Sequence, residues 1–150
     1  LQALPSVDVF VAGMGTGGSV TGVGRRLREA NPNVQLVAME PHLGDFVQGL
    51  RSLREGFIPP ILDLNQLSGK ILVYAKDAFF WTRELARREG LFAGLSSGAA
   101  LYGALKWVQR LDTANVVVLF ADGGWKYLST GLWQDPTIDN REGLDDTIWW

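Results

Sequence analysis

The 150-residue sequence has no cysteine, a single histidine and almost no net charge. Without cysteine, the chain has no disulfide bond, no thiolate zinc site and no cysteine nucleophile. His42, the single histidine, has no carboxylate cluster beside it, so we expect no metal site and interpret it as a loop residue. The formal net charge is −2 and the arginine pairs are isolated, which argues against nucleic acid as a partner.

Long hydrophobic runs are also missing from the sequence. No apolar run approaches the ~20 residues that a membrane-spanning helix requires, and no basic region precedes an apolar core at the start of the chain. We therefore expect a cytoplasmic protein with no membrane partner. A chain of 150 residues is long enough to bury one hydrophobic core without disulfides or a structural metal.

Apolar runs alternate with helical patterns along the chain. The runs predict strands, and the patterns predict helices, over the following ranges: strands 7–12, 34–39, 71–74, 91–95 and 116–120; helices 19–30, 77–90 and 97–110. This alternation predicts an α/β fold, a doubly wound parallel sheet with helices on both faces and so three layers. We expect Asp77 to cap the second helix, and the unbroken apolar run 116–120 is typical of a strand covered on both faces. The irregular section 42–69 is long enough to indicate a lid or a binding loop.

A glycine-rich loop, Met14-Gly15-Thr16-Gly17-Gly18-Ser19, separates the first predicted strand from the first predicted helix. The first N–H groups of a helix have no partner within it, and the helix dipole adds partial positive charge there. Glycines let the backbone approach a ligand closely, and the hydroxyls of Thr16 and Ser19 are further donors. The loop therefore predicts a phosphate or carboxylate site. The alternative is a plain glycine turn in which Ser19 caps the helix.

Nucleotide-binding motifs fit this loop only in part. The Gly-Lys-Ser/Thr of a P-loop is absent, because Ser19-Val20-Thr21 follows the glycines. Gly13, Gly15 and Gly18 do satisfy the dinucleotide pattern G-x-G-x-x-G, and Glu40 lies at about the expected distance for a ribose-binding acid. A dinucleotide-binding domain therefore remains open as an alternative.

Three polar turns follow predicted strands and should lie on the same rim of the sheet, over 14–19, 95–98 and 121–125. Open parallel sheets bind their ligands at this rim, outside the carboxyl ends of the strands. In the second turn, either Ser96 or Ser97 could simply cap the next helix. Three such turns on one rim favour at least one of them facing a ligand.

Five blocks occur in a familiar order: Gly15 to Ser19, Glu40-Pro41, Glu55 to Pro59, Glu89 to Ala100 and Lys126 to Thr130. The chain thereby resembles the cysteine synthases, which are pyridoxal-phosphate-dependent β-replacement enzymes of fold type II. Within that family it is most similar to the actinobacterial O-phosphoserine sulfhydrylases. The features that indicate this are residues 121–127, the short section 50–57 and a C-terminal tail ending in aromatic residues.

The resemblance implies a role for each matching residue. Residues 1–136 would be the part of the larger domain that binds the phosphate of pyridoxal 5′-phosphate, and 137–150 an aromatic tail over the active site. The cofactor phosphate would be held by Gly15, Thr16, Gly17, Gly18 and Ser19. Ser96 would hydrogen-bond the pyridine nitrogen, and Arg51 would contact the phosphate of O-phosphoserine. The reaction would convert O-phosphoserine or O-acetylserine, with a sulfur donor, into cysteine.

The chain also departs from the family. The family's Schiff-base lysine lies in an N-terminal part that these 150 residues do not contain, and the lysines present match no family position: Lys70, Lys76, Lys106 and Lys126. We therefore expect a fragment with no catalytic residue of its own. Its partners would be an amino-acid substrate, a complementary N-terminal half or further copies of itself, and a sulfur-carrier protein as a further candidate.

The missing half should also leave the first strand, 7–12, without its usual neighbours. The alternative to an enzyme part is a non-catalytic module that binds a phosphate-bearing ligand or a protein.

Overall fold

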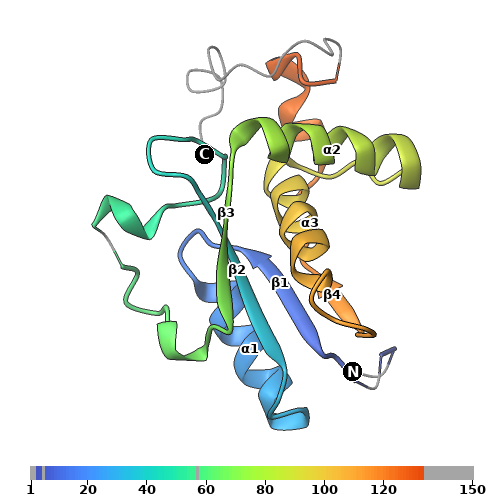
Figure 1. Ribbon diagram of the computed structural model, residues 1–150. Helices are drawn as coiled ribbons and strands as arrows, with labels where there is room; N and C mark the ends of the chain where they lie inside the picture. The colour runs from blue at the N-terminus through green and yellow to red at the C-terminus, as the bar shows by residue number, and fades with distance from the viewer. Residues whose placement is uncertain (1–2, 5, 57, 134–150) are drawn as a thin grey trace.

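The computed structural model describes residues 3–4, 6–56 and 58–133, so the predicted tail 137–150 lies outside the described residues. Its centre is a four-stranded parallel sheet with the strand order β3-β2-β1-β4 (Figure 1). The strands are β1 (Val9–Gly13), β2 (Gln35–Pro41), β3 (Gly69–Val73) and β4 (Val116–Val118). Because all four run parallel, their carboxyl ends meet at one rim.

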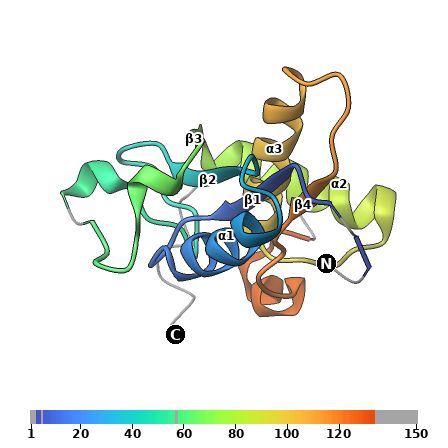
Figure 2. The ribbon, with the colours of Figure 1, turned by 90° about the horizontal axis from the view of Figure 1, so that it is seen from below.

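Three helices cover the two faces of this sheet. Helix α1 (Gly18–Ala30) packs on one face, and α2 (Ala75–Glu89) and α3 (Leu95–Val108) lie on the other (Figures 1 and 2). Two hydrophobic clusters fill the spaces between helices and sheet, one on each face. Val9 to Ala12 of β1 are fully or almost fully buried because they contribute to both clusters. The predicted three-layer α/β fold is confirmed.

The segment 91–95, expected as a strand, is not part of the sheet. Gly90 ends α2 in the left-handed conformation and Gly94 is already the N-cap of α3, so three residues remain between the two helices. A connection of three residues is too short to bring the chain back to the sheet. Ala93 forms only an isolated antiparallel bridge with Gly123. The strand prediction failed because two glycine-bounded helix ends follow each other directly.

The helix starts also differ from those expected. Helix α2 begins at Ala75 rather than at Asp77, and the Ala75 N–H donates to Oδ2 of Asp45 at 2.8 Å. Asp77 lies in the first turn of α2 instead of capping it. A distant residue therefore supplies the cap, which the local sequence of the helix could not reveal.

The sheet edges are also not where the sequence placed them. We expected strand 7–12 to lack neighbours, but β1 pairs with β2 on one side and β4 on the other. Within the described residues the edges are β3 and β4. As a consequence β4 is only half-buried, although its run of valines is typical of a strand covered on both faces.

The irregular section 42–69 is largely irregular, as predicted. It contains two single-turn 3₁₀ helices, η1 (Leu53–Glu55) and η2 (Leu64–Gln66).

Among the described helices, none combines the length and apolarity that crossing a bilayer requires.

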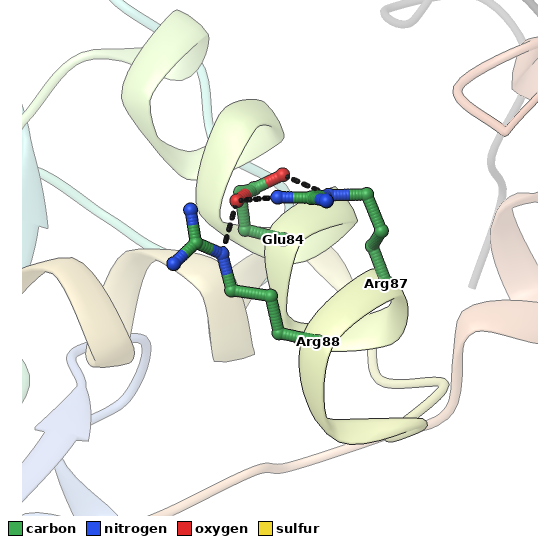
Figure 3. Close-up of polar contacts among 3 residues, drawn as sticks. All are labelled: Glu84, Arg87 and Arg88. Atoms are coloured by element: carbon green, nitrogen blue, oxygen red, sulfur yellow. Dashed lines mark hydrogen bonds and ion pairs between the residues drawn. The ribbon is translucent and has the colours of Figure 1, made fainter.

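A surface ion cluster supports the end of α2. Glu84 accepts hydrogen bonds from Arg87 at 2.7 and 2.8 Å and from Arg88 at 2.5 Å (Figure 3). These two arginines lower the pKa of Glu84 to about 2. The ionised Glu84 therefore stabilises the folded chain above the ordinary carboxylate pKa of 4.5, and this contribution is lost as the pH falls toward 2. The cluster lies on α2, where both arginine side chains are exposed and that of Glu84 is partly buried.

Gly98 allows α2 and α3 to cross closely. A Cβ at this position would lie 2.6 Å from the backbone nitrogen of Thr82 and would also overlap the Ala78 carbonyl oxygen. We predict that Gly98→Ala lowers the free energy of unfolding by about 1–3 kcal/mol through overpacking. Gly22→Ala is the control, because Gly22 lies in α1 with open space around it and the change should raise stability by about 0.5–1 kcal/mol. Chemical denaturation measures both, and equal effects would contradict this account of the helix crossing.

Candidate functional site

A cleft of about 720 Å³ opens at the carboxyl ends of the strands. It is lined by the loop after β1, by parts of the section after β2, by Ser96 of α3, and by Leu119 and Ala121 after β4. After β1 the chain passes through α1 to β2 on one side of β1, whereas β4 lies on the other side. The cleft lies at the end of β1, between these two sides of the sheet. Open α/β sheets bind ligands at this kind of position.

The cleft brings together the binding residues that the family resemblance implied. Its lining includes Arg51, Ser96 and the whole glycine loop, Gly15, Thr16, Gly17, Gly18 and Ser19. These residues come from three separate parts of the chain. The structure therefore places them around one cavity, while their individual roles remain predictions.

The glycine loop leads directly into α1 and leaves the start of that helix uncapped by any described side chain. Gly17 is the N-cap, with φ +81° and ψ −3°, and the first turn contains no acidic residue. Ser19 is not the cap that the plain-turn alternative required, because it lies inside the helix and lines the cleft. The first N–H groups of α1 and the positive end of its dipole are thus available to an anion.

Two of the glycines are required by their surroundings. Gly17 has a left-handed backbone, and a Cβ there would lie 2.8 Å from Cβ of Leu62. A Cβ on Gly15 would lie 2.8 Å from the Gly49 carbonyl oxygen. The loop can pass through this narrow space only without side chains at these two positions.

Met14 fixes the loop at its entry. The Met14 N–H donates to the Met39 carbonyl at the end of β2, and the Met14 carbonyl accepts from the Arg51 N–H, both at 2.8 Å. Met14 itself is fully buried. These bonds hold Arg51 beside the glycine loop, although the two are far apart in sequence.

Ser96 reaches the cleft from the first turn of α3. It is nearly buried, and its Oγ lies beside Gly49, where an added Cβ would be 3.9 Å away. Gly94, rather than a serine, is the N-cap of α3, so neither Ser96 nor Ser97 caps the helix as the alternative proposed.

Asp122 makes the start of α3 electrostatically different from the start of α1. Its carbonyl accepts from the Gly94 N–H at 3.0 Å, and its carboxylate lies directly against Gly94. The hydroxyl of Tyr127 donates to Oδ2 of Asp122 at 3.0 Å, and burial together with this carboxylate raises the pKa of Tyr127. A negative charge thus already meets the N-terminus of α3, which leaves the N-terminus of α1 as the better anion site.

Glu40 does not line the cleft. Its side chain is buried, its Oε2 accepts from the Leu53 N–H at 2.9 Å, and its Oε1 pairs with Nζ of Lys70 at 3.0 Å. A dinucleotide site would need this carboxylate free for ribose hydroxyls. Because the carboxylate is already bonded within the protein, the structure gives the dinucleotide interpretation no support.

Each of the four lysines contacts a partner outside the cleft. Lys70 pairs with Glu40, Lys126 pairs with Asp122 at 3.5 Å, and Lys76 and Lys106 each lie over a tyrosine ring at 5.6 Å. In the part of the chain that the structure describes, Arg51 is the one basic residue lining the cleft. The ring of His42 stacks on Tyr74 at 3.7 Å, and within the described ranges no group of three His, Asp or Glu side chains could hold a metal.

Comparison with known proteins gives the family. Residues 1–122 match the family described as pyridoxal-phosphate dependent enzyme. The chain belongs to this family.

The relatives of the chain include several cysteine synthases. The chain is 40% identical over 139 residues to a cysteine synthase of Aquifex aeolicus, a match covering 89% of this chain and 42% of that protein. It is 36% identical over 135 residues to cysteine synthase B of Escherichia coli, covering 90% and 45%.

Solved structures agree with these matches. A cysteine synthase of Entamoeba histolytica superposes with a TM-score of 0.78 at 29% identity, covering 87% of this chain and 41% of that one. A hydrogen-sulfide-producing enzyme of Fusobacterium nucleatum gives 0.77 at 33% identity, covering 82% and 45%. The chain thus spans less than half the length of each of these relatives.

The residues of the cleft fit the family's cofactor. Pyridoxal phosphate carries a phosphate dianion, which suits the uncapped N-terminus of α1 and the narrow passage at Gly15 and Gly17. Its ring needs a hydrogen-bonding group at the nitrogen, and Ser96 offers a hydroxyl in the same cleft. These are the residues that would hold the cofactor.

The glycine loop yields a direct test with inorganic phosphate. At ten times its Kd, phosphate should stabilise the parent chain by about 1.4 kcal/mol through linkage. We predict that Gly17→Ala abolishes this stabilisation, because the left-handed backbone and Leu62 leave no room for a methyl group. Thermal denaturation with and without phosphate measures the effect.

Gly90→Ala is the matched control for this test. Gly90 also has a positive φ, +69°, but has open space around it at the end of α2. This change should destabilise the fold by about 1 kcal/mol and leave the phosphate effect intact. A Gly17→Ala variant that keeps the full phosphate stabilisation would show that the anion binds elsewhere.

Proposed function

We propose that this chain forms the cofactor-binding part of a cysteine synthase, which replaces the β-substituent of an activated serine with sulfur. The observation that carries the proposal is the uncapped N-terminus of α1, which opens into the same cleft as Ser96 and Arg51. The names of the relatives support the reaction class. Because the chain covers less than half of those relatives, we propose that catalysis requires the part of the enzyme that they contain in addition.

Each residue of the proposed site has a separate task. The N–H groups of the loop Gly15 to Ser19 would hold the cofactor phosphate. The Ser96 hydroxyl would bond the ring nitrogen and, being neutral, would leave the ring a weaker electron sink than a carboxylate would. When bound, pyridoxal phosphate supplies the electron withdrawal from the substrate α-carbon that β-elimination needs.

Arg51 supports O-phosphoserine as the substrate in preference to O-acetylserine. Among the described residues, it is the only basic one that lines the cleft, and its guanidinium makes no ion pair with any of them. A guanidinium binds a phosphate dianion through two parallel charge-assisted hydrogen bonds, whereas a neutral acetyl ester offers no comparable partner.

Substrate choice can be tested with two arginines of the same segment. With pyridoxal phosphate present, Arg51→Ala should weaken the binding of O-phospho-L-serine by about tenfold or more and leave O-acetyl-L-serine unaffected. Arg54→Ala is the control, since Arg54 is exposed in η1 and does not line the cleft. Calorimetric titration measures both. Equal losses for the two variants, or equal binding of the two amino acids by the parent, would refute this assignment of Arg51.

The cofactor itself gives a second test. We predict that pyridoxal phosphate binds this chain non-covalently and is displaced by inorganic phosphate, because no lysine lines the cleft. Borohydride reduction followed by peptide mapping should therefore show no single lysine labelled stoichiometrically. One fully labelled lysine would contradict the proposed geometry.

A non-catalytic phosphate-binding module is the second candidate, and the positions of the lysines favour it. Each of the four has a partner away from the cleft, so the described residues offer no amine to the cofactor. Adding the N-terminal part of a cysteine synthase separates the two candidates. Cysteine formation after mixing supports the enzyme part, and phosphate binding without any activity supports the module.

A further inference from the structure

Glu40 is a buried charged residue for which the proposed reaction has no use. It is 1% exposed and lies near the end of β2, beside the cleft but not in its lining. Removing a carboxylate from water is unfavourable unless it is paired and hydrogen-bonded. Both conditions hold here, through the N–H of Leu53 at 2.9 Å and Nζ of Lys70 at 3.0 Å.

The two partners of Glu40 come from different elements. Lys70 lies on β3, next to β2 in the sheet, and its side chain is 37% exposed, so it reaches the buried carboxylate from the solvent side. Leu53 is the first residue of η1 in the section after β2. The carboxylate therefore ties the sheet to a segment that makes no strand pairing of its own.

That segment carries two residues of the cleft, Arg51 and Glu55, on either side of Leu53. Two hydrogen bonds of its backbone attach it to the glycine loop and the sheet: the Arg51 N–H donates to the Met14 carbonyl, and the Leu53 N–H donates to Glu40. The bond at Leu53 fixes the direction of the backbone after Arg51, together with the packing of the Leu50 and Leu53 side chains against the two hydrophobic clusters.

We propose that Glu40 and Lys70 are positioning residues that hold Arg51 against the glycine loop and so set the affinity of the cleft for a phosphorylated serine. The proposal rests on the function proposed above for Arg51. Neither Glu40 nor Lys70 touches the ligand, and both act through the backbone of residues 51–55.

The test is a double-mutant cycle on the full chain with pyridoxal phosphate present. Glu40→Gln keeps the size of the side chain but presents an amide to Lys70, and Lys70→Met removes the cation while keeping an unbranched chain. Each should weaken the binding of O-phospho-L-serine by about three- to tenfold. In an Arg51→Ala background the same changes should have no further effect on that binding, because they act through Arg51.

Two controls separate positioning from general loss of structure. Glu84→Gln removes a carboxylate that also has cationic partners (Figure 3) but lies on α2, outside the lining of the cleft. This change should leave the binding of both pyridoxal phosphate and O-phospho-L-serine unaffected. Pyridoxal phosphate affinity should stay within about twofold of the parent in every variant, since the glycine loop keeps its own bond to β2. Amide hydrogen exchange adds a readout without ligand, in which Glu40→Gln should speed exchange at Leu53 and Arg51.

The outcomes distinguish this inference from the proposed function. If the parent binds neither pyridoxal phosphate nor O-phospho-L-serine, the proposed function fails and the inference fails with it. If the parent binds both, but Glu40→Gln and Lys70→Met leave O-phospho-L-serine affinity unchanged, the inference alone is overturned. Losses of equal size with and without Arg51 would also overturn it. If Glu40→Gln does not fold, Lys70→Met in the two backgrounds decides the question.

Discussion

The pair of backbone hydrogen bonds made by Met14 is the constraint on which the site depends. They join the end of β1 to the end of β2 and to the segment that contains Arg51. Once Met14 is fixed, the next residues must turn through a space bounded by the Gly49 carbonyl and the side chain of Leu62. Side chains at positions 15 and 17 would not fit there, so the glycines follow from packing as well as from ligand approach. The section 42–69 is therefore the second wall of the cleft.

Electrostatics then selects one of the two helix ends near the cleft. Both α1 and α3 begin at this rim, and each has a glycine as its N-cap. The start of α3 already has the carboxylate of Asp122 beside it, held by Tyr127. The start of α1 has no acidic residue in its first turn. A dianion is thus favoured at α1, and a neutral hydrogen-bonding group is favoured beside Ser96, an asymmetry that suits a cofactor with a charged and an uncharged end.

Local patterns were enough to predict the parts of the molecule that local chemistry determines. The glycine loop and the three-layer arrangement are present as predicted, and the strands alternate with helices except at 91–95, where α3 follows α2 directly. Contacts between residues far apart in the sequence could not be predicted in this way. Asp45 accepts from the first N–H of α2, thirty residues away, and β4 pairs with β1 although most of the chain separates them. The spacing of Glu40 in the sequence suggests a ribose-binding acid, and only the structure shows that its carboxylate is bonded to Leu53 and Lys70.

The central claim is that an anion binds at the N-terminus of α1 through backbone N–H groups. Nuclear magnetic resonance of the nitrogen-15-labelled chain, titrated with pyridoxal phosphate, tests it most directly. The account predicts that the largest amide shifts fall on Gly15 to Ser19, with smaller shifts at Ser96 and near Arg51, all saturating with one dissociation constant. Shifts centred on another surface, or a glycine loop that does not respond, would contradict it.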